Sequence, residues 1–213
     1  MNPNFSAEQS PIVLYRHPLS GHAHRAQLML SLLDVPYETV DVDLMGGEHK
    51  TPDFLAKNPF GQVPVIEDNG VHISDANAIL VYLATRYADG YEWLPTAPQQ
   101  AAEVQRWLSV AAGEIFNGPC MVRLVKLFGM PFDYDTAKQR TDAFFAILEP
   151  LLAASDFLVD GRITLADVAA YSYIAHVEEG AVSLAPYPAI RAWLARVEAQ
   201  PRFVGMQRSE LAA

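Results

Sequence analysis

Cysteine is almost missing from this sequence, which has only Cys120 among its 213 residues. A single cysteine excludes an internal disulfide framework and any C-x-x-C redox or zinc motif. It fits a reducing compartment, so we expect a cytoplasmic protein without a metal site. Long apolar runs are also missing, because none reaches the ~20 residues that a membrane helix needs. Residues 1–8 lack the basic and then apolar pattern of a signal peptide, and we expect them to form a loose tail.

Basic residues are few as well. The chain has 15 Lys and Arg against 25 Asp and Glu, which gives a formal net charge of −10. Nucleic-acid binding usually needs a basic face, so the charge balance disfavours it. Hydrophobic residues make up 51% and charged residues 19%, a composition typical of a globular protein. The length permits one or two domains.

The first part of the chain, residues 11–88, alternates short apolar runs with proline and glycine. The pattern predicts a strand over 12–15, a helix from Ser20 to about Leu33, a strand over 37–42 and a short helix near 51–55. A strand, helix and strand of this length imply a parallel pair with a right-handed crossover. A hairpin and another helix follow, so we expect the order βαβαββα around a small mixed four-stranded sheet.

Beyond about Ala88 the strand-like runs disappear, and residues 97–208 predict an all-helical domain. Helices are expected over 99–127 (kinked near Gly118 and Pro119), 135–154, 164–177 and 188–200, with a short last helix from Pro201. Thr164 and Asp167 have the spacing of a capping box for the third of these helices. That helix is almost wholly apolar, so it should lie in the middle of the domain.

The stretch from Asn58 to Ile79 carries the most information. It reads N-P-F-G-Q-V-P-V-I-E-D-N-G-V-H-I-S-D-A-N-A-I. An Asn-Gly turn between apolar runs is a strong hairpin signal, and Ser74 and Asp75 can cap the helix that follows. Pro64 must lie where its missing N–H does no harm, and a cis bond there would present the backbone of Val63 to an extended peptide ligand. The simplest local interpretation is an ordinary hairpin that leads into a helix.

The whole string resembles the glutathione-binding core of the cytosolic glutathione transferases. Gly47-Glu48-His49-Lys50 and His17-Pro18-Leu19-Ser20 are most similar to the plant-type (phi) branch and its bacterial relatives. The resemblance covers nearly the whole chain. It implies a thioredoxin-like N-terminal domain, an all-helical C-terminal domain and a homodimer with the helices after Asp75 and Gln99 near its two-fold axis. It also implies glutathione as co-substrate, without a permanently bound cofactor.

Ser20 is the catalytic candidate that the resemblance implies. The matching serine of the family donates its hydroxyl hydrogen bond to the sulfur of glutathione. A free thiol has a pKa of ~8.5, and a hydroxyl donor at a helix N-terminus favours the thiolate. Local sequence alone favours an ordinary N-cap serine, and both roles need the same place. If Ser20 were not the donor, Tyr15 or His22 would be the alternatives.

The glutathione-binding candidates follow the same resemblance. His49 and Lys50 would bind the glycine carboxylate of glutathione, while Gln62 and the backbone of Val63 would hold the rest of the tripeptide. Local sequence by itself would make His49 and Lys50 a solvated pair in a mobile loop, and Gln62 a loop amide.

At Asp75 and Ala76 the match weakens. Related enzymes usually carry Glu-Ser or Gln-Ser here, where the acid or amide meets the γ-glutamyl ammonium and the serine meets its carboxylate. Asp75 keeps the acid with a shorter reach, and Ala76 offers only its N–H. One hydrogen bond to a charged group contributes roughly 1.5–3 kcal/mol, so we expect weaker glutathione binding than in a relative with serine.

The function that the resemblance implies is attack of the glutathione thiolate on a small hydrophobic electrophile. Phe116, Met121 and Leu124 are candidates for an apolar pocket, although helical core packing also explains them. Peroxide reduction, isomerisation or dehalogenation would begin from the same thiolate. A non-enzymatic binding or scaffold protein is the alternative from another class, and Ala76 favours it.

Overall fold

The computed structural model describes residues 2–5, 9–89 and 91–209. It divides into two compact units, residues 1–94 with 201–207 and residues 95–200 with 208–213. Each unit is described by itself. The narrower boundaries expected from the sequence, 11–88 and 97–208, stay predictions.

The first unit has the predicted order βαβαββα. Its elements are β1 (Ile12–Arg16), α1 (Gly21–Leu32), β2 (Tyr37–Asp41), the 3₁₀ helix η1 (Glu48–Lys50), α2 (Pro52–Leu55), β3 (Val65–Asp68), β4 (Val71–Ser74) and α3 (Ala76–Tyr87). The strand order is β2-β1-β3-β4, with β1 parallel to β2 and the other pairs antiparallel. The mixed four-stranded sheet of a thioredoxin-like domain is therefore confirmed.

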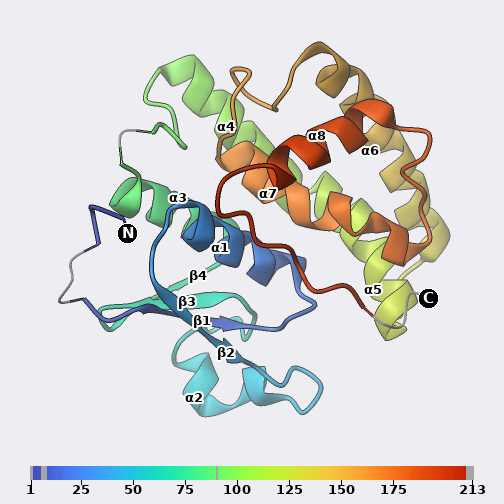
Figure 1. The fold of residues 1–213 in the computed structure, drawn as a ribbon. Coiled ribbons are helices and arrows are strands. Elements are labelled where there is room, and N and C mark those ends of the chain that lie inside the picture. The colour runs from blue at the N-terminus through green and yellow to red at the C-terminus, as the bar shows by residue number, and fades with distance from the viewer. Residues whose placement is uncertain (1, 6–8, 90, 210–213) are drawn as a thin grey trace. The chain divides into compact units, whose positions relative to one another are not determined.

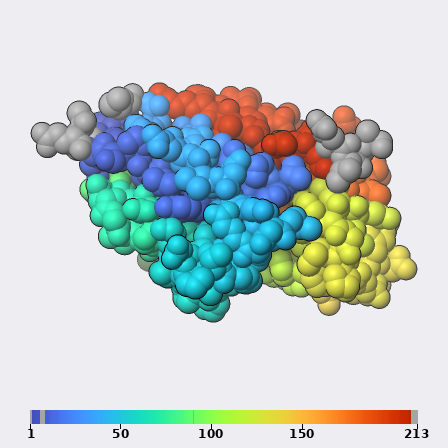
Figure 2. Space-filling model, turned by 90° about the horizontal axis from the view of Figure 1, so that it is seen from below, coloured from blue at the N-terminus to red at the C-terminus, as the bar shows by residue number. Residues whose placement is uncertain are grey.

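Helices cover both faces of this sheet (Figure 1). On one face, α1 and α3 pack over Leu14 and Ile66, which pair with each other across β1 and β3 and are fully buried. On the other face, Phe54 of α2 packs on Val65, with Tyr15 at its edge. Figure 2 shows the surface that η1 and α2 (cyan) form on this second face. The alternation of buried side chains follows from the period of two along a strand.

The N-terminal segment is not a loose tail where the structure describes it, so that expectation is wrong for residues 2–5. The side-chain amide of Asn2 donates to the carbonyl oxygens of Leu33 and Tyr87, at 2.5 and 2.8 Å. Phe5 is buried and stacks against Tyr87 with 6.0 Å between ring centroids. These contacts satisfy carbonyl groups at the ends of α1 and α3, which have no intrahelical partner. Met1 and residues 6–8 lie outside the described part.

The short last helix expected from Pro201 is also wrong over the described residues 201–209. Arg202 has a φ of 63°, which interrupts a right-handed helix. The segment instead binds α1 of the first unit: Ser31 Oγ donates to Arg202 O at 2.6 Å, and His24 Nε2 lies 2.8 Å from Val204 O. Tertiary hydrogen bonds therefore replace the helical ones.

The second unit is all-helical, as predicted. Its elements are α4 (Pro98–Ala112), the π-helix η2 (Phe116–Cys120), α5 (Met121–Phe128), α6 (Tyr134–Ala154), α7 (Leu165–Ala175), the 3₁₀ helix η3 (Val177–Gly180) and α8 (Pro188–Glu198). The predicted interruption near Pro119 is real, because a proline inside a helix removes a hydrogen bond and displaces the preceding turn. Cys120 is buried. In the described part of the chain, no helix is long and apolar enough to cross a membrane.

The predicted capping box opens α7. Thr164 Oγ1 accepts from the N–H of Ala166, and Oδ2 of Asp167 accepts from the N–H of Thr164 at 2.9 Å. The ten residues from Leu165 to Ile174 are all buried. The almost wholly apolar helix thus lies at the centre of its unit, as its composition predicts.

Candidate functional site

One end of the sheet of the first unit brings most predicted site residues together. The register pairs Tyr15 with Val65 and Val65 with Ser74. The C-terminal end of β1, the start of β3 and the C-terminal end of β4 therefore lie at the same end of the sheet. Ser20 follows β1, Val63 precedes β3 and Asp75 follows β4. Helices α1 and α3 both begin at this end of the sheet. Orphan N–H groups and the helix macrodipole favour negative charge there.

Ser20 is the N-cap of α1. Its backbone is extended (φ −85°, ψ 114°), and Oγ accepts a hydrogen bond from the N–H of Ala23 at 3.3 Å. The Ser20 oxygen thus accepts one hydrogen bond. Its hydroxyl hydrogen has no acceptor among the described residues and can be donated to a ligand. A hydroxyl can accept and donate at once. The N-cap role and a donor role are therefore compatible at Ser20.

Asp75 is the N-cap of α3 and has an unusual backbone, with φ 74° and ψ 125°. A non-glycine residue at such a φ costs of order 1–3 kcal/mol and persists only where the surroundings hold it. Here Oδ1 accepts from the N–H groups of both Asn77 and Ala78, each at 2.9 Å. Oδ2 has no hydrogen-bond partner among the described residues. Ala76, the first residue of α3, is buried.

The side chain of Asn58 stabilises the loop before β3. This side chain is buried, and its Nδ2 donates to Gln62 O at 2.8 Å while its Oδ1 accepts from Phe60 N at 3.1 Å. The Val63–Pro64 peptide bond is cis. The pairing of β3 with its neighbouring strands begins at Val65. Among the described residues, none forms a hydrogen bond with the N–H or C=O of Val63. The side chain of Gln62 is exposed.

His49 and Lys50 form most of the 3₁₀ helix η1, which lies within the loop that local sequence suggests. Lys50 Nζ donates to Phe60 O at 3.2 Å and to Gly61 O at 3.0 Å, which connects η1 to the loop before Val63. His49 Nδ1 is buried, and no described residue gives it a hydrogen bond. The structure therefore brings all seven predicted residues to one region of the first unit.

The two alternative hydrogen-bond donors near Ser20 are both engaged. The Tyr15 hydroxyl donates to Glu67 Oε2 at 3.0 Å on the sheet face that α2 covers. Burial and this hydrogen bond raise the pKa of Tyr15. His22 Nδ1 lies 3.2 Å from Arg25 Nη1, and burial, followed by the charge of Arg25, lowers the pKa of His22 to about 3. His22 is thus neutral at neutral pH.

Comparison with known proteins identifies the family of the chain. Family models for the glutathione S-transferase N-terminal and C-terminal domains match residues 10–85 and 125–201. The chain is 32% identical over 207 residues to glutathione S-transferase 3 of Zea mays, covering 91% of this chain and 92% of the relative. The chain belongs to the glutathione S-transferase family. A crystal structure of a glutathione S-transferase from Pseudomonas fluorescens matches with a TM-score of 0.87 and 34% identity, over 93% of this chain and all of that one.

One further similarity bears on the alternative class. Elongation factor 1-gamma of Drosophila melanogaster is 32% identical over 168 residues, which cover 78% of this chain but 38% of that protein. A sequence of the glutathione S-transferase family can thus resemble part of a protein with another name.

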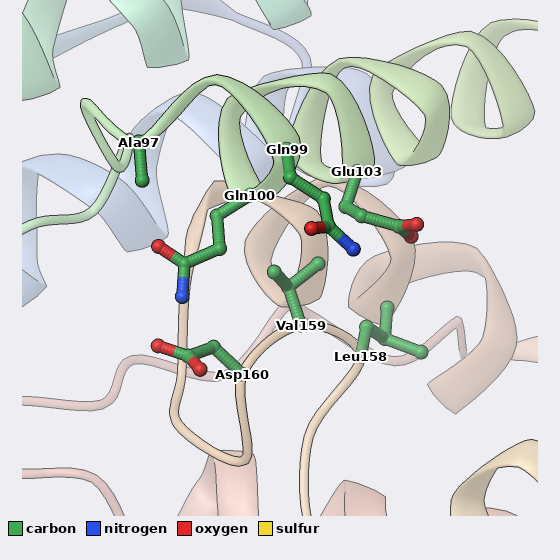
Figure 3. Close-up of a pocket in the computed structure, with 7 residues that line it drawn as sticks. All are labelled: Ala97, Gln99, Gln100, Glu103, Leu158, Val159 and Asp160. Atoms are coloured by element: carbon green, nitrogen blue, oxygen red, sulfur yellow. The ribbon is translucent and has the colours of Figure 1, made fainter.

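A separate hollow of about 480 Å³ lies in the helical unit, between the start of α4 and the loop before α7 (Figure 3). Gln100 and Asp160 reach toward each other across its mouth. Its two carboxylates already have partners: Glu103 pairs with Arg106 at 2.7 Å, and Asp160 with Arg162 at 3.3 Å. None of the seven predicted site residues lines it. Nor do the half-buried pocket candidates Phe116, Met121 and Leu124.

Asn58 is the site residue that sequence reasoning missed. Asn58 is not among the residues that the sequence predicts for the site, yet its buried side-chain amide bonds to both Phe60 N and Gln62 O. The signal was present, because asparagine side chains commonly bond the backbone two residues on. The second bond, to Gln62 O, has no such local rule.

Proposed function

We propose that this chain is a glutathione transferase in which Ser20 stabilises the glutathione thiolate for attack on a small hydrophobic electrophile. The observation that carries the proposal is the hydroxyl of Ser20. It stands at the N-terminus of α1, accepts from Ala23 N–H and keeps its hydrogen for a ligand. A bond accepted by the oxygen strengthens the bond that its hydrogen donates.

The rest of the tripeptide is proposed to bind along the same end of the sheet. Val63 offers an unpaired backbone N–H and C=O for strand-like pairing with the cysteine of glutathione. Oδ2 of Asp75 is the acceptor for the γ-glutamyl ammonium, and the N–H of Ala76 is a donor for the adjacent carboxylate. His49 and Lys50 would receive the glycine carboxylate, and Gln62 would help Val63 to hold the rest of the tripeptide.

The reaction needs no covalent bond to the protein. The thiol of bound glutathione loses its proton to solvent, and the thiolate keeps the electron pair. That pair forms a carbon–sulfur bond at the electrophile, whose leaving group departs with its own bonding pair or whose double bond accepts the charge. Ser20 donates to sulfur and is not the nucleophile. Its contribution is a larger thiolate fraction at neutral pH.

Ser20→Ala tests this proposal. Loss of a hydrogen bond to a charged sulfur should slow conjugation of a generic aryl halide roughly 10- to 100-fold at neutral pH. Glutathione affinity and the unfolding midpoint should change little, because the other contacts remain. Ser20→Thr, which keeps the hydroxyl, serves as the control. Conjugation by Ser20→Ala at the rate of the unsubstituted protein would refute the role of Ser20.

A scaffold function is the alternative that Ala76 favours. Under that alternative the protein binds glutathione weakly and shows no thiolate and no turnover with any electrophile. Peroxide reduction, isomerisation and dehalogenation share the thiolate step, so a panel of electrophiles separates them.

Homodimerisation is part of the proposal, and the cytoplasm is its proposed setting. Phe60 and Val71 in the first unit are 77% and 58% exposed, and a second copy of the chain would cover such apolar side chains. Sedimentation analysis should give twice the mass of one chain. Cys120, the one cysteine of the chain, is buried and outside any disulfide, which supports a reducing compartment, where glutathione chemistry takes place.

A further inference from the structure

We infer that Lys50 is a positioning residue for the glutathione site: it holds the loop Phe60–Val63 in its binding shape and acts on the ligand through that loop. This inference rests on the proposed function and names the means by which one of its residues acts.

Lys50 already has its hydrogen-bond partners within the protein. Its Nζ donates to two consecutive carbonyl oxygens, Phe60 O at 3.2 Å and Gly61 O at 3.0 Å. Bonds in which the donor is charged are about twice as strong as neutral ones. An ammonium has three donors in all, so two of the three are used on the loop.

The third carbonyl of the loop has a different side-chain donor. Gln62 O accepts from the buried amide of Asn58 at 2.8 Å. Three successive carbonyl groups thus have side-chain donors, and these fix the peptide planes that lead directly to Val63. Because Val63 offers its own backbone groups to the ligand, its orientation depends on those three anchors.

The space around Gly61 shows that η1 and the loop pack closely together. Gly61 has a φ of +57°, and a Cβ added there would lie 2.6 Å from His49 O and 2.9 Å from Lys50 Nζ. The turn of η1 therefore sits directly against Gly61. Removal of the ammonium would leave two carbonyl groups to find other partners, and the loop would lose its shape before any ligand arrives.

The test compares two thiols, glutathione and γ-glutamylcysteine, which lacks the glycine. Binding of each is measured by calorimetry for the unsubstituted protein, Lys50→Met and Lys57→Met. Lys57 is a neighbouring lysine outside the loop, so it controls for the loss of one positive charge. We expect Lys50→Met to weaken the binding of γ-glutamylcysteine roughly tenfold and that of glutathione by at least the same factor, and Lys57→Met to leave both unchanged.

The two possible failures are distinguishable. If Lys50 acts only on the glycine carboxylate, Lys50→Met weakens glutathione and leaves γ-glutamylcysteine unchanged, which overturns the inference. If the unsubstituted protein binds neither thiol, the proposed function itself fails.

Hydrogen exchange without any ligand gives a second readout that a direct ligand contact would not move. The amide of Gly61, which bonds to Asn58 O at 2.9 Å, should exchange at least severalfold faster in Lys50→Met. Lys50→Arg, which keeps a cation, should restore part of the protection. Unchanged exchange at Gly61 in Lys50→Met would contradict the positioning role. Should Lys50→Met not fold, Lys50→Gln replaces it in both measurements.

Discussion

The indole N–H of Trp193 donates a 2.9 Å hydrogen bond to Oδ1 of Asp167, which lies 26 residues earlier in the chain. The same oxygen accepts from Leu158 N at 3.0 Å, and Oδ2 accepts from Thr164 N at 2.9 Å. One buried carboxylate thus joins α8, the loop before α7 and the first turn of α7.

Asp167→Ala should therefore be strongly destabilising. The change leaves two buried N–H groups, of Thr164 and Trp193, and the half-buried N–H of Leu158 without an acceptor, and each such group costs about 1–3 kcal/mol. We expect a loss of at least ~3 kcal/mol in the free energy of unfolding of the helical unit. Asp167→Asn keeps one acceptor oxygen and should lose less. Urea unfolding followed by tryptophan fluorescence measures both, and an equal, small loss in the two variants would contradict this account.

The pH dependence of stability should also report Asp167. Burial raises the pKa of Asp167 from 3.8 to about 6 in the folded protein, so the folded state binds the proton more tightly than the unfolded state. The stability from this group is present below pH ~4 and is lost as the pH rises to about 6. The loss corresponds to about 3 kcal/mol.

Asp167→Asn does not titrate and isolates this effect. The difference in unfolding free energy between the unsubstituted protein and Asp167→Asn should shift against the unsubstituted protein between pH ~4 and ~6. A constant difference over that window would show that the carboxylate keeps its ordinary pKa in the fold.

Ala76→Ser should tighten glutathione binding. The substitution adds a hydroxyl beside the N-terminus of α3, where the γ-glutamyl carboxylate is proposed to bind. One added bond to a charged group predicts an affinity gain of roughly tenfold or more. Ala78→Ser, at an exposed position in the same turn, is the matched control and should change nothing. If calorimetry finds no gain for Ala76→Ser, the carboxylate does not bind at this residue.

Two glycines with positive φ allow a paired test of the site loop. Gly61 has a φ of +57° and close neighbours, whereas Gly70 has a φ of +79° and nothing within 4 Å of an added Cβ. Both alanine variants incur a backbone cost of about 1–2 kcal/mol. Only Gly61→Ala should also displace η1 and weaken glutathione binding. Equal thiol affinities in Gly61→Ala and Gly70→Ala would argue against the packing of η1 on this loop.

Much of the fold could be predicted because its signals are local. The Asn-Gly turn between β3 and β4, the N-caps Ser20 and Asp75, and the capping box Thr164–Asp167 all act within a few residues. Periodicity placed the helices and strands to within a few residues. The candidate site came from resemblance to a family, and the register of β1, β3 and β4 then explains why its residues meet.

The errors concern contacts between distant segments. Asn2 bonds to Tyr87 O, 85 residues away, and Arg202 O accepts from Ser31 Oγ, 171 residues away. No local sequence pattern encodes such contacts. For this reason the sequence predicts a loose N-terminal segment and a helical C-terminal segment, although both are held by hydrogen bonds to distant residues. The bond from Lys50 to Gly61 O spans only 11 residues, but it depends on the fold of the intervening helix α2.

The most direct test of the central claim is the ultraviolet thiolate absorbance of glutathione added to the purified protein at neutral pH, with Ser20→Ala measured alongside. We predict a saturable thiolate signal in the unsubstituted protein that Ser20→Ala removes while glutathione still binds. Glutathione that binds the unsubstituted protein without any thiolate signal would contradict the account and favour a scaffold function.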